Sequence, residues 1–306
     1  MKTNSFFRGI GHQTLLYTVV FSLLLSCSFD HSFLKPTSFS RAQNRIVAAS
    51  SSDTTVLTIS GRDLQPSITK TSDNGDLSET SIKGVTFISG SGNNLNGWLL
   101  SPVSKKAITT IIHLHGNGGF MLSHLGFGTS MVKQGYQVFM FDYSGFGYSS
   151  GEATRENSMN DALSAIDFVL SMPEVAGTKI VLYGQSFGGH LAPMVAGERL
   201  EKIDVLVLEG AFTSYPAIAG KQVPLLGPVL VKGGNSALKS IPNITIPVLI
   251  IHSREDKVIP FRMGEKLYEK ASEPREFMAI DGCHICGPSL YPEEISKKID
   301  ALVDSY

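Results

Sequence analysis

The sequence predicts an α/β protein with a mostly parallel sheet of eight strands and helices on both faces. Short apolar runs alternate with stretches of helical periodicity, which is typical of a parallel sheet. Several runs are continuously apolar and β-branched, as expected for strands that are covered on both faces. The expected strands are Val85–Ile88, Leu95–Leu100, Thr109–Leu114, Gln137–Phe141, Lys179–Tyr183, Val205–Leu208, Val248–His252 and Glu276–Ile280.

The stretches between these strands predict helices. In Ser158–Met172 apolar residues recur at i, i+3 and i+4, which indicates an amphipathic helix. Residues 261–271 and 293–306 have the same pattern, and another helix is expected directly after Ser186. Because ligands of such sheets bind at the carboxyl ends of the strands, we expect the functional site there.

The N-terminus differs from the rest of the chain. The uncharged apolar stretch Thr14–Ser26 is shorter than the roughly 20 residues of a membrane-spanning helix and has the length of a signal-peptide core. Its end, LLSC at Leu24–Cys27, resembles the bacterial lipoprotein signal. That resemblance implies removal of residues 1–26, lipidation of Cys27 and a place in the cell envelope, facing the periplasm or the exterior. An ordinary export signal and an uncleaved anchor are the alternatives.

Residues 27–83 are rich in serine and threonine and poor in large apolar side chains, which predicts a polar tether with one early strand at Thr55–Ile59. The folded domain is expected over residues 84–306. Only a short cap insertion fits between Gly210 and Pro247, so the site should be fairly open. The apolar run Val223–Val231 in this insertion could line an acyl or alkyl pocket, or it could pack on the sheet.

Composition narrows the classes of partner. The net charge of −1 over 306 residues gives no electrostatic reason to expect nucleic acid. If Cys27 carries a lipid, Cys283 and Cys286 remain, and they could form a disulfide or stay as two free thiols. His113 and His115 lack the paired ligand spacings of a zinc site, so neither a metal nor a cofactor is expected.

The motif Gly184–Gly188, with Ser186 at its centre, lies between an expected strand and an expected helix. Such a turn strains the serine and places it at a helix N-terminus, whose dipole favours developing negative charge. A serine nucleophile requires a base, and His284 lies on a loop just past the last expected strand. Asp256 follows the preceding expected strand and is the carboxylate expected to orient the imidazole, with the adjacent Glu255 as the alternative.

The order of serine, aspartate and histidine on this scaffold resembles the α/β-hydrolase fold family over residues 85–306. His113–Gly119 is similar to the oxyanion loop of that family, and Asp142–Gly151 is similar to its glycine-rich loop after the fourth strand. The resemblance implies an oxyanion hole made by the backbone N–H groups of Asn117 and Phe187.

Within that family the chain is most similar to small esterases and to lysophospholipase-like and depalmitoylase-like enzymes. The resemblance implies a serine hydrolase that cleaves carboxylic esters or thioesters of small molecules or lipids through an acyl-enzyme. Ser186 would be the nucleophile, His284 the base and Asp256 its partner. A peptidase or amidase with the same triad is one alternative, and a catalytically idle surface binding protein is another.

Overall fold

The computed structural model describes residues 33–49, 54–70 and 77–305. The apolar stretch Thr14–Ser26 and the lipidation residue Cys27 lie outside these ranges. Among the described residues, no helix combines the length and the apolar character needed to cross a bilayer.

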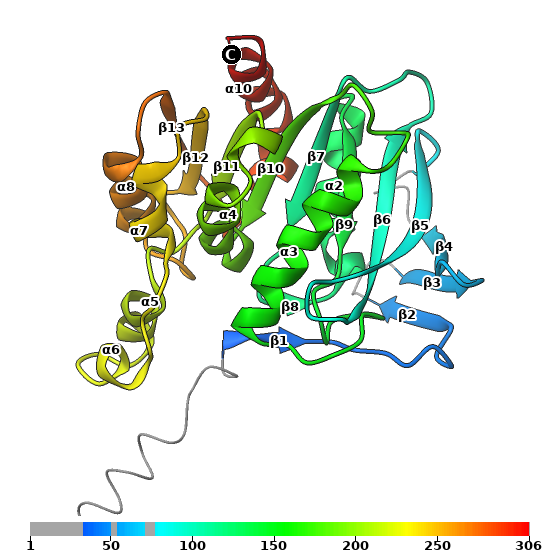
Figure 1. Cartoon of the computed structure of the whole chain (residues 1–306), viewed down its shortest axis with the longest axis horizontal. Helices are drawn as coiled ribbons and strands as arrows, with labels where there is room; N and C mark the ends of the chain where they lie inside the picture. Colours follow the sequence, from blue (N-terminus) through cyan, green and yellow to red (C-terminus); the bar gives the residue numbers. More distant parts are fainter. Residues whose placement is uncertain (1–32, 50–53, 71–76, 306) are drawn as a thin grey trace, which may run out of the picture.

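All eight predicted strands form one sheet with the order β13-β12-β11-β10-β7-β9-β6-β5 (Figure 1), so the predicted fold class is confirmed. The strand β6 runs antiparallel to both of its neighbours, and the other pairs are parallel. The strands are β5 (Thr80–Ile88), β6 (Asn94–Pro102), β7 (Thr109–Leu114), β9 (Gln137–Phe141), β10 (Lys179–Gln185), β11 (Val205–Glu209), β12 (Val248–Ser253) and β13 (Arg275–Ile280).

Helices cover both faces of this sheet. One face packs against α3 (Arg155–Leu170), α4 (Phe187–Gly197) and α8 (Phe261–Lys270), and the other packs against α2 (Leu125–Lys133) and α10 (Pro292–Ser305). The four helices predicted from the sequence are thereby confirmed. Besides three helices of the cap insertion, the remaining described helical segments are short: Met121–His124, Leu200–Lys202, Ile241–Asn243 and α9 (Gly287–Leu290).

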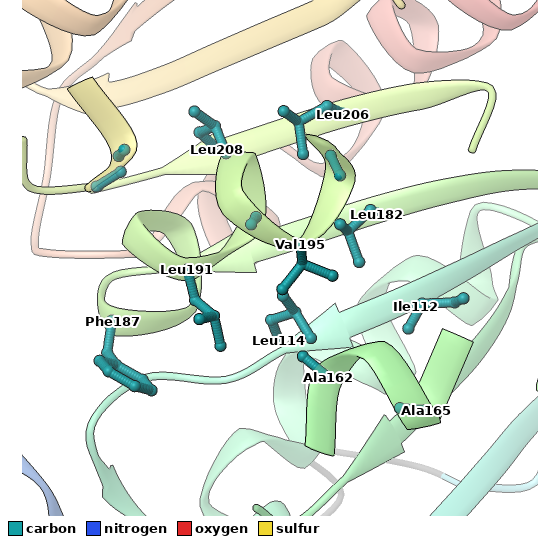
Figure 2. Packing of buried hydrophobic residues seen from close by; sticks show 14 of the residues in the cluster. Ile112, Leu114, Ala162, Ala165, Leu182, Phe187, Leu191, Val195, Leu206 and Leu208 are labelled. Atoms are coloured by element: carbon teal, nitrogen blue, oxygen red, sulfur yellow. The ribbon is translucent and has the colours of Figure 1, made fainter. Parts of the chain in front are cut away.

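Alternate side chains of the central strands supply the two cores. In β7, Ile112 and Leu114 point toward α3 and α4, whereas Ile111 belongs to the core on the opposite face. Figure 2 shows Leu191 and Val195 of α4 on the same side as these two β7 residues. Because both faces are covered, the strand residues are apolar without interruption, as the sequence pattern indicated.

The prediction of a polar tether over residues 27–83 is wrong for the described part of that segment. A three-stranded antiparallel sheet forms there, and the early strand predicted at Thr55–Ile59 is confirmed as its central strand. Leu57 and Ile59 are buried against the main sheet, in the same core as Trp98. Alternation leaves the other face polar, which gave the segment its tether-like composition. The strands are β2 (Arg45–Ala49), β3 (Thr54–Ser60) and β4 (Gln65–Lys70).

Residues 33–39, here called the N-terminal strap, lie along the carboxyl ends of the strands. Within the strap, β1 (Lys35–Pro36) pairs in parallel with β8 (Gly118–Gly119), directly after Asn117. The Asn117 side chain donates to the Phe33 carbonyl at 2.8 Å. The strap therefore contacts the loop to which the sequence analysis assigns an oxyanion hole.

The cap insertion contains α5 (Tyr215–Gln222), α6 (Gly227–Leu230) and α7 (Ala237–Ser240). Both interpretations of the run Val223–Val231 are wrong for most of its side chains, because they neither line the pocket beside Ser186 nor pack on the sheet. The exposed apolar residues of this run are Val223, Leu225, Leu226, Val229 and Leu230.

Candidate active site

Adjacent strand ends bring the predicted site residues to one edge of the sheet. Ser186 follows β10, Gly210 follows β11, Asp256 follows β12 and His284 follows β13. Because these strands are neighbours and parallel, their carboxyl ends meet at the same edge. The topology thus gathers side chains that are up to about a hundred residues apart in sequence.

The turn at Ser186 is strained and tightly packed. Ser186 has φ 55° and ψ −110°, a conformation that costs a non-glycine residue of order 1–3 kcal/mol. A Cβ at Gly188 would lie 1.9 Å from the Leu114 carbonyl oxygen, and a Cβ at Gly184 would lie 2.4 Å from the Gly188 oxygen. Both positions therefore require glycine. Helix α4 begins at Phe187, so the N–H of this residue has no partner within the helix.

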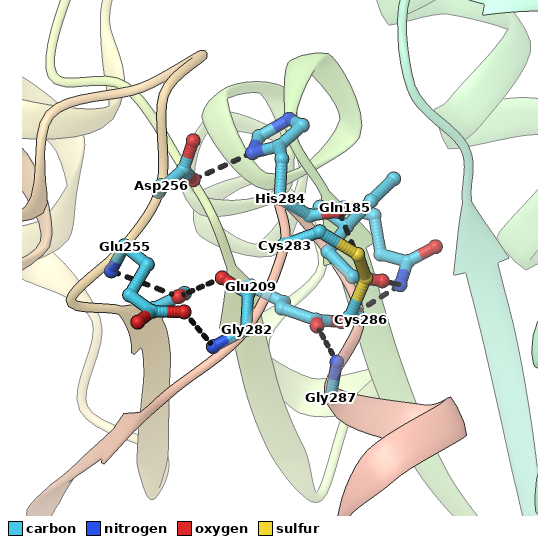
Figure 3. Close-up of a disulfide and its surroundings, with 11 residues drawn as sticks. Gln185, Glu209, Glu255, Asp256, Gly282, Cys283, His284, Cys286 and Gly287 are labelled. Atoms are coloured by element: carbon cyan, nitrogen blue, oxygen red, sulfur yellow. Dashed lines mark hydrogen bonds and ion pairs between the residues drawn. A yellow bond between two sulfur atoms is a disulfide. The ribbon is translucent and has the colours of Figure 1, made fainter.

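Asp256 holds His284 by a short hydrogen bond (Figure 3). His284 Nδ1 lies 2.6 Å from Asp256 Oδ2, and the Asp256 side chain is 1% exposed. The other oxygen, Oδ1, accepts the N–H groups of Val258 and Ile259 at 2.8 Å each. Burial alone would raise the pKa of Asp256, but the hydrogen bond and charge of His284, with these two N–H groups, lower it below its ordinary value. Asp256 is therefore ionised at neutral pH.

Glu255, the alternative carboxylate, does not contact His284. Its Oε2 accepts the N–H of Gly282 at 3.0 Å, so it braces the start of the loop that carries the histidine. His284 Nε2 has no hydrogen-bond partner among the described residues, and none of the described hydrogen bonds joins it to Ser186 Oγ. Bonds between nucleophile and base often tighten only when substrate is bound.

His252 is a second histidine beside Asp256, and its role was not foreseen from the sequence. Its Nε2 lies 3.0 Å from the Ile259 carbonyl and 3.5 Å from Asp256 Oδ2. A carbonyl can only accept, so Nε2 carries the proton. Burial lowers the pKa of His252, so the ring is neutral and adds a donor near the carboxylate. A histidine four residues before the expected acid was the available signal.

Glu209 is a buried carboxylate that joins the strands beneath the site, and sequence reasoning did not assign it a role. It accepts the Gln185 amide and the Gly287 N–H, each at 2.7 Å (Figure 3). It also accepts the Tyr183 hydroxyl at 3.0 Å. Gly287 follows the His284 loop, so Glu209 ties that loop to β10 and β11. Burial raises the pKa of Glu209. The carboxylate at the end of a continuous apolar strand was the signal that could have found it.

Replacing Glu209 with alanine should lower the free energy of unfolding by about 3 kcal/mol, because three buried donors would lose their acceptor. Urea denaturation at pH 7.5 measures this loss. Glu255→Ala is the matched control, since it removes an exposed carboxylate with a single hydrogen bond to Gly282, and a change below about 1 kcal/mol is expected. Equal losses in the two variants would contradict the assignment of Glu209 as the central brace.

Cys283 and Cys286 are joined by a disulfide that brackets His284 (Figure 3). The covalent ring formed by these four residues limits the conformations of the loop that carries the imidazole. His284 is thus held from one side by the disulfide and from the other by Asp256. This arrangement fixes the position of the ring more firmly than a free loop would.

A small pocket of about 70 Å³ opens beside Ser186, well below the roughly 300–1,000 Å³ of a typical ligand pocket. Both residues of the predicted oxyanion hole, Asn117 and Phe187, line it. None of the described hydrogen bonds uses the backbone N–H of Asn117. The other lining residues are Phe33, Phe212, Ile218, Gln222, Val258 and Ile259.

The remaining described histidines serve packing. His113 stacks on Phe127 with ring centroids 4.0 Å apart, and His190 stacks on Phe212 at 4.0 Å while its Nδ1 bonds the Phe212 carbonyl at 2.9 Å. Burial lowers the pKa of His190 to about 3. In the described part of the chain, no group of three or more His, Cys, Asp or Glu residues is arranged to hold a metal ion.

The lowered pKa of His190 predicts that the folded protein loses stability in acid. Its folded pKa of about 3 lies below the unfolded value near 6.5, so the unfolded state binds more protons and stability falls as the pH drops below 6.5. Burial raises the pKa of Asp142 to about 8, which acts in the opposite direction. The comparison with His190→Phe isolates the histidine: between pH 6.5 and 4.5 the wild type should lose about 2 kcal/mol more than the variant in urea denaturation. Parallel pH profiles would contradict a neutral His190.

Comparison with known proteins agrees with this architecture. The sequence profile of the family described as serine aminopeptidase, S33, matches residues 105–231. YfhR of Salmonella typhi is 37% identical over 216 residues, which cover 66% of this chain and 74% of that protein. The α/β-hydrolase domain-containing protein WAV2 of Arabidopsis thaliana is 27% identical over 199 residues, or 60% of this chain and 65% of WAV2.

Two solved structures share the fold. The esterase Pf2001 of Pyrococcus furiosus superposes with a TM-score of 0.61 at 19% identity and covers 74% of this chain and 93% of its own. Est1E of Butyrivibrio proteoclasticus, solved with ferulic acid bound, has a TM-score of 0.60 at 20% identity and covers 71% of this chain and 98% of its own.

Proposed function

Because this chain belongs to the α/β-hydrolase family and is a hydrolase, we propose that it is a serine hydrolase which cleaves carboxylic esters or thioesters through an acyl-enzyme. Ser186 Oγ attacks the carbonyl carbon, and His284 takes the hydroxyl proton and later delivers it to the leaving group. Asp256 stabilises the imidazolium. The backbone N–H groups of Asn117 and Phe187 bind the oxyanion of the tetrahedral intermediate.

The observation that carries this proposal is the hydrogen-bonding state of His284. Nδ1 lies against the ionised carboxylate of Asp256 and therefore carries the proton. Nε2 then presents a lone pair and has no partner among the described residues. A base in this tautomer can accept a proton from Ser186, which lies at the end of a neighbouring strand on a strained turn.

The pocket lining favours an apolar acyl group over the N-terminus of a peptide. An aminopeptidase must bind an α-ammonium group, which calls for a carboxylate near the scissile bond. Among the described residues that line the pocket beside Ser186, none is acidic, and Phe33, Phe212 and Ile218 are apolar. This observation supports ester or thioester substrates with short acyl groups.

A fluorophosphonate probe tests the proposal, since it labels only an activated serine. We expect the wild type to be labelled and to hydrolyse p-nitrophenyl acetate and butyrate faster than the laurate ester, with no release of p-nitroaniline from aminoacyl anilides. Labelled protein that cleaves only the anilides would establish the peptidase alternative. Folded protein that takes no label would establish a binding protein.

We also propose that the enzyme is attached to a membrane of the cell envelope. The sequence LLSC at Leu24–Cys27 supports lipidation of Cys27 and attachment to a membrane. Mass spectrometry of the mature N-terminus tests this: a diacylglyceryl-modified Cys27 is expected. An unmodified N-terminus created by cleavage at another residue would show an ordinary export signal, and a chain that still starts at Met1 would show an uncleaved anchor.

A further inference from the structure

The cap carries an exposed apolar surface. Leu225 is 90% exposed and Val229 is 81% exposed, although both belong to a run of apolar residues. Contiguous exposed apolar patches of this kind mark interaction sites on soluble domains. The surface, here called the apolar cap surface, consists of Val223, Leu225, Leu226, Val229, Leu230 and Val258.

This surface borders the entrance of the pocket beside Ser186. Val258 lines the pocket, and so does Gln222, which directly precedes Val223. Lys221 Nζ donates to the Val258 carbonyl at 2.7 Å, which joins α5 to the loop after β12. A substrate chain too long for a pocket of about 70 Å³ would therefore extend over apolar side chains as it leaves the pocket.

The charges of the cap have one sign. Between Ala211 and Pro247 the sequence contains no aspartate or glutamate, and its charged residues are Lys221, Lys232 and Lys239. Segments that bind at the interface of anionic bilayers typically combine exposed apolar side chains with basic residues. The cap has this composition, since its exposed residues include leucine and valine and its only charged residues are lysines. A protein partner with an acidic apolar surface is a less direct match, because α5 and α6 protrude from the body of the domain (Figure 1).

The described part of the chain begins at the same end of the molecule. Phe33 packs on Tyr215 at the start of α5 with ring centroids 5.2 Å apart. The stretch Thr14–Ser26 ends seven residues before Phe33, and seven extended residues span at most about 25 Å. A lipid on Cys27, or the stretch itself in a membrane, would hold the cap end of the domain close to the bilayer.

We propose that the apolar cap surface docks on a bilayer that contains anionic lipid and turns the entrance of the pocket toward the membrane. The apolar side chains enter the acyl region, and the positive charge of the three cap lysines favours a surface of anionic headgroups. The implied substrates are esters or thioesters whose short acyl group enters the pocket and whose long apolar leaving group remains in the membrane. That last step rests on the proposed serine hydrolase activity, whereas the docking itself does not.

Tryptophan quenching in vesicles tests the docking independently of activity. Leu226→Trp reports on the cap, and Ile108→Trp is the matched control, because Ile108 is 81% exposed at the opposite edge of the sheet. The native Trp98 is 1% exposed and gives the same background in both variants. The full chain is reconstituted in vesicles of phosphatidylcholine and phosphatidylglycerol with brominated acyl chains. The Leu226→Trp emission should fall about twofold, as expected for a side chain some 5–10 Å deep, and that of Ile108→Trp should not change.

Two outcomes would overturn the proposal. Equal emission of both variants with and without bromolipid would mean that the cap does not enter the bilayer. Protection of Leu226→Trp from acrylamide without quenching by bromolipid would mean that a second copy of the chain or another protein segment covers the surface.

A kinetic comparison tests the consequence for substrates. Leu225→Glu/Leu226→Glu should hydrolyse soluble p-nitrophenyl butyrate like the wild type. It should hydrolyse a vesicle-embedded butyrate ester of a long-chain alcohol about tenfold more slowly, because the charges oppose entry into the bilayer. Val103→Glu/Ile108→Glu, which carries the same charges at the opposite edge, should match the wild type on both substrates. Equal slowing on both substrates would contradict docking. If the wild type cleaves neither ester, the proposed function fails, and the quenching result still decides the docking.

Discussion

Ser186→Ala is expected to lower kcat for p-nitrophenyl butyrate by about 10⁵–10⁶-fold. Without Oγ no acyl-enzyme forms, and only the oxyanion donors and the binding pocket can still accelerate attack by water. The fold should be unaffected, because the backbone at φ 55° strains an alanine about as much as a serine. Circular dichroism and urea denaturation check this, and stopped-flow hydrolysis measures the rate.

Non-additivity distinguishes a catalytic pair from two independent contributions. Ser186 and His284 act in the same proton transfer. The kcat of Ser186→Ala/His284→Ala should therefore lie within about threefold of the kcat of Ser186→Ala. Multiplicative losses in the double variant would contradict the pairing. If the Ser186→Ala variant kept a tenth of the wild-type activity, this result would contradict the assignment of Ser186 as the nucleophile.

Asp256→Asn is expected to lower kcat by about 10⁴-fold, because it favours the tautomer of His284 that cannot act as a base. The structure specifies how the amide will orient. Oδ1 accepts two backbone N–H groups, from Val258 and Ile259, so the amide oxygen must take that position. The amide nitrogen then faces His284 Nδ1, which must accept instead of donating. The proton moves to Nε2, and His284 can no longer act as a base toward Ser186.

Glu255→Gln is the matched control for this substitution, since it changes the neighbouring acidic residue in the same loop. It should alter kcat by less than about threefold, because Glu255 contacts the Gly282 N–H and not the imidazole. Kinetics between pH 6 and 9, with thermal melts of both variants, separate loss of catalysis from loss of folding. If Glu255→Gln proved to be the slower variant, the roles of the two carboxylates would have to be exchanged.

The parts of the fold that were predictable are those whose pattern is local. A continuous apolar run such as Val205–Leu208 reveals a buried strand by itself, and the sequence Gly184–Gly188 reveals a sharp turn. The edge on which Ser186, Asp256 and His284 meet followed from the rule for parallel sheets, because each residue comes directly after its own strand.

The parts that were not predictable depend on contacts distant in sequence. Lys35 pairs with Gly118, and no local pattern in a serine-rich segment marks such a partner. Glu209 has a defined role only when Gln185 and Gly287 are placed beside it. The apolar cap run was assigned to a buried position because apolar composition normally indicates burial, whereas Leu225 is 90% exposed.

The N-terminal strap has a practical consequence for anyone who prepares this protein. A shortened gene that starts at residue 84, where composition places the domain boundary, would delete Phe33, β1 to β4 and the first four residues of β5. Such a product would lose one wall of the pocket and the strand that pairs with the loop after Asn117. An affinity tag belongs at the C-terminus, where α10 ends at Ser305, away from the strand ends that carry the site.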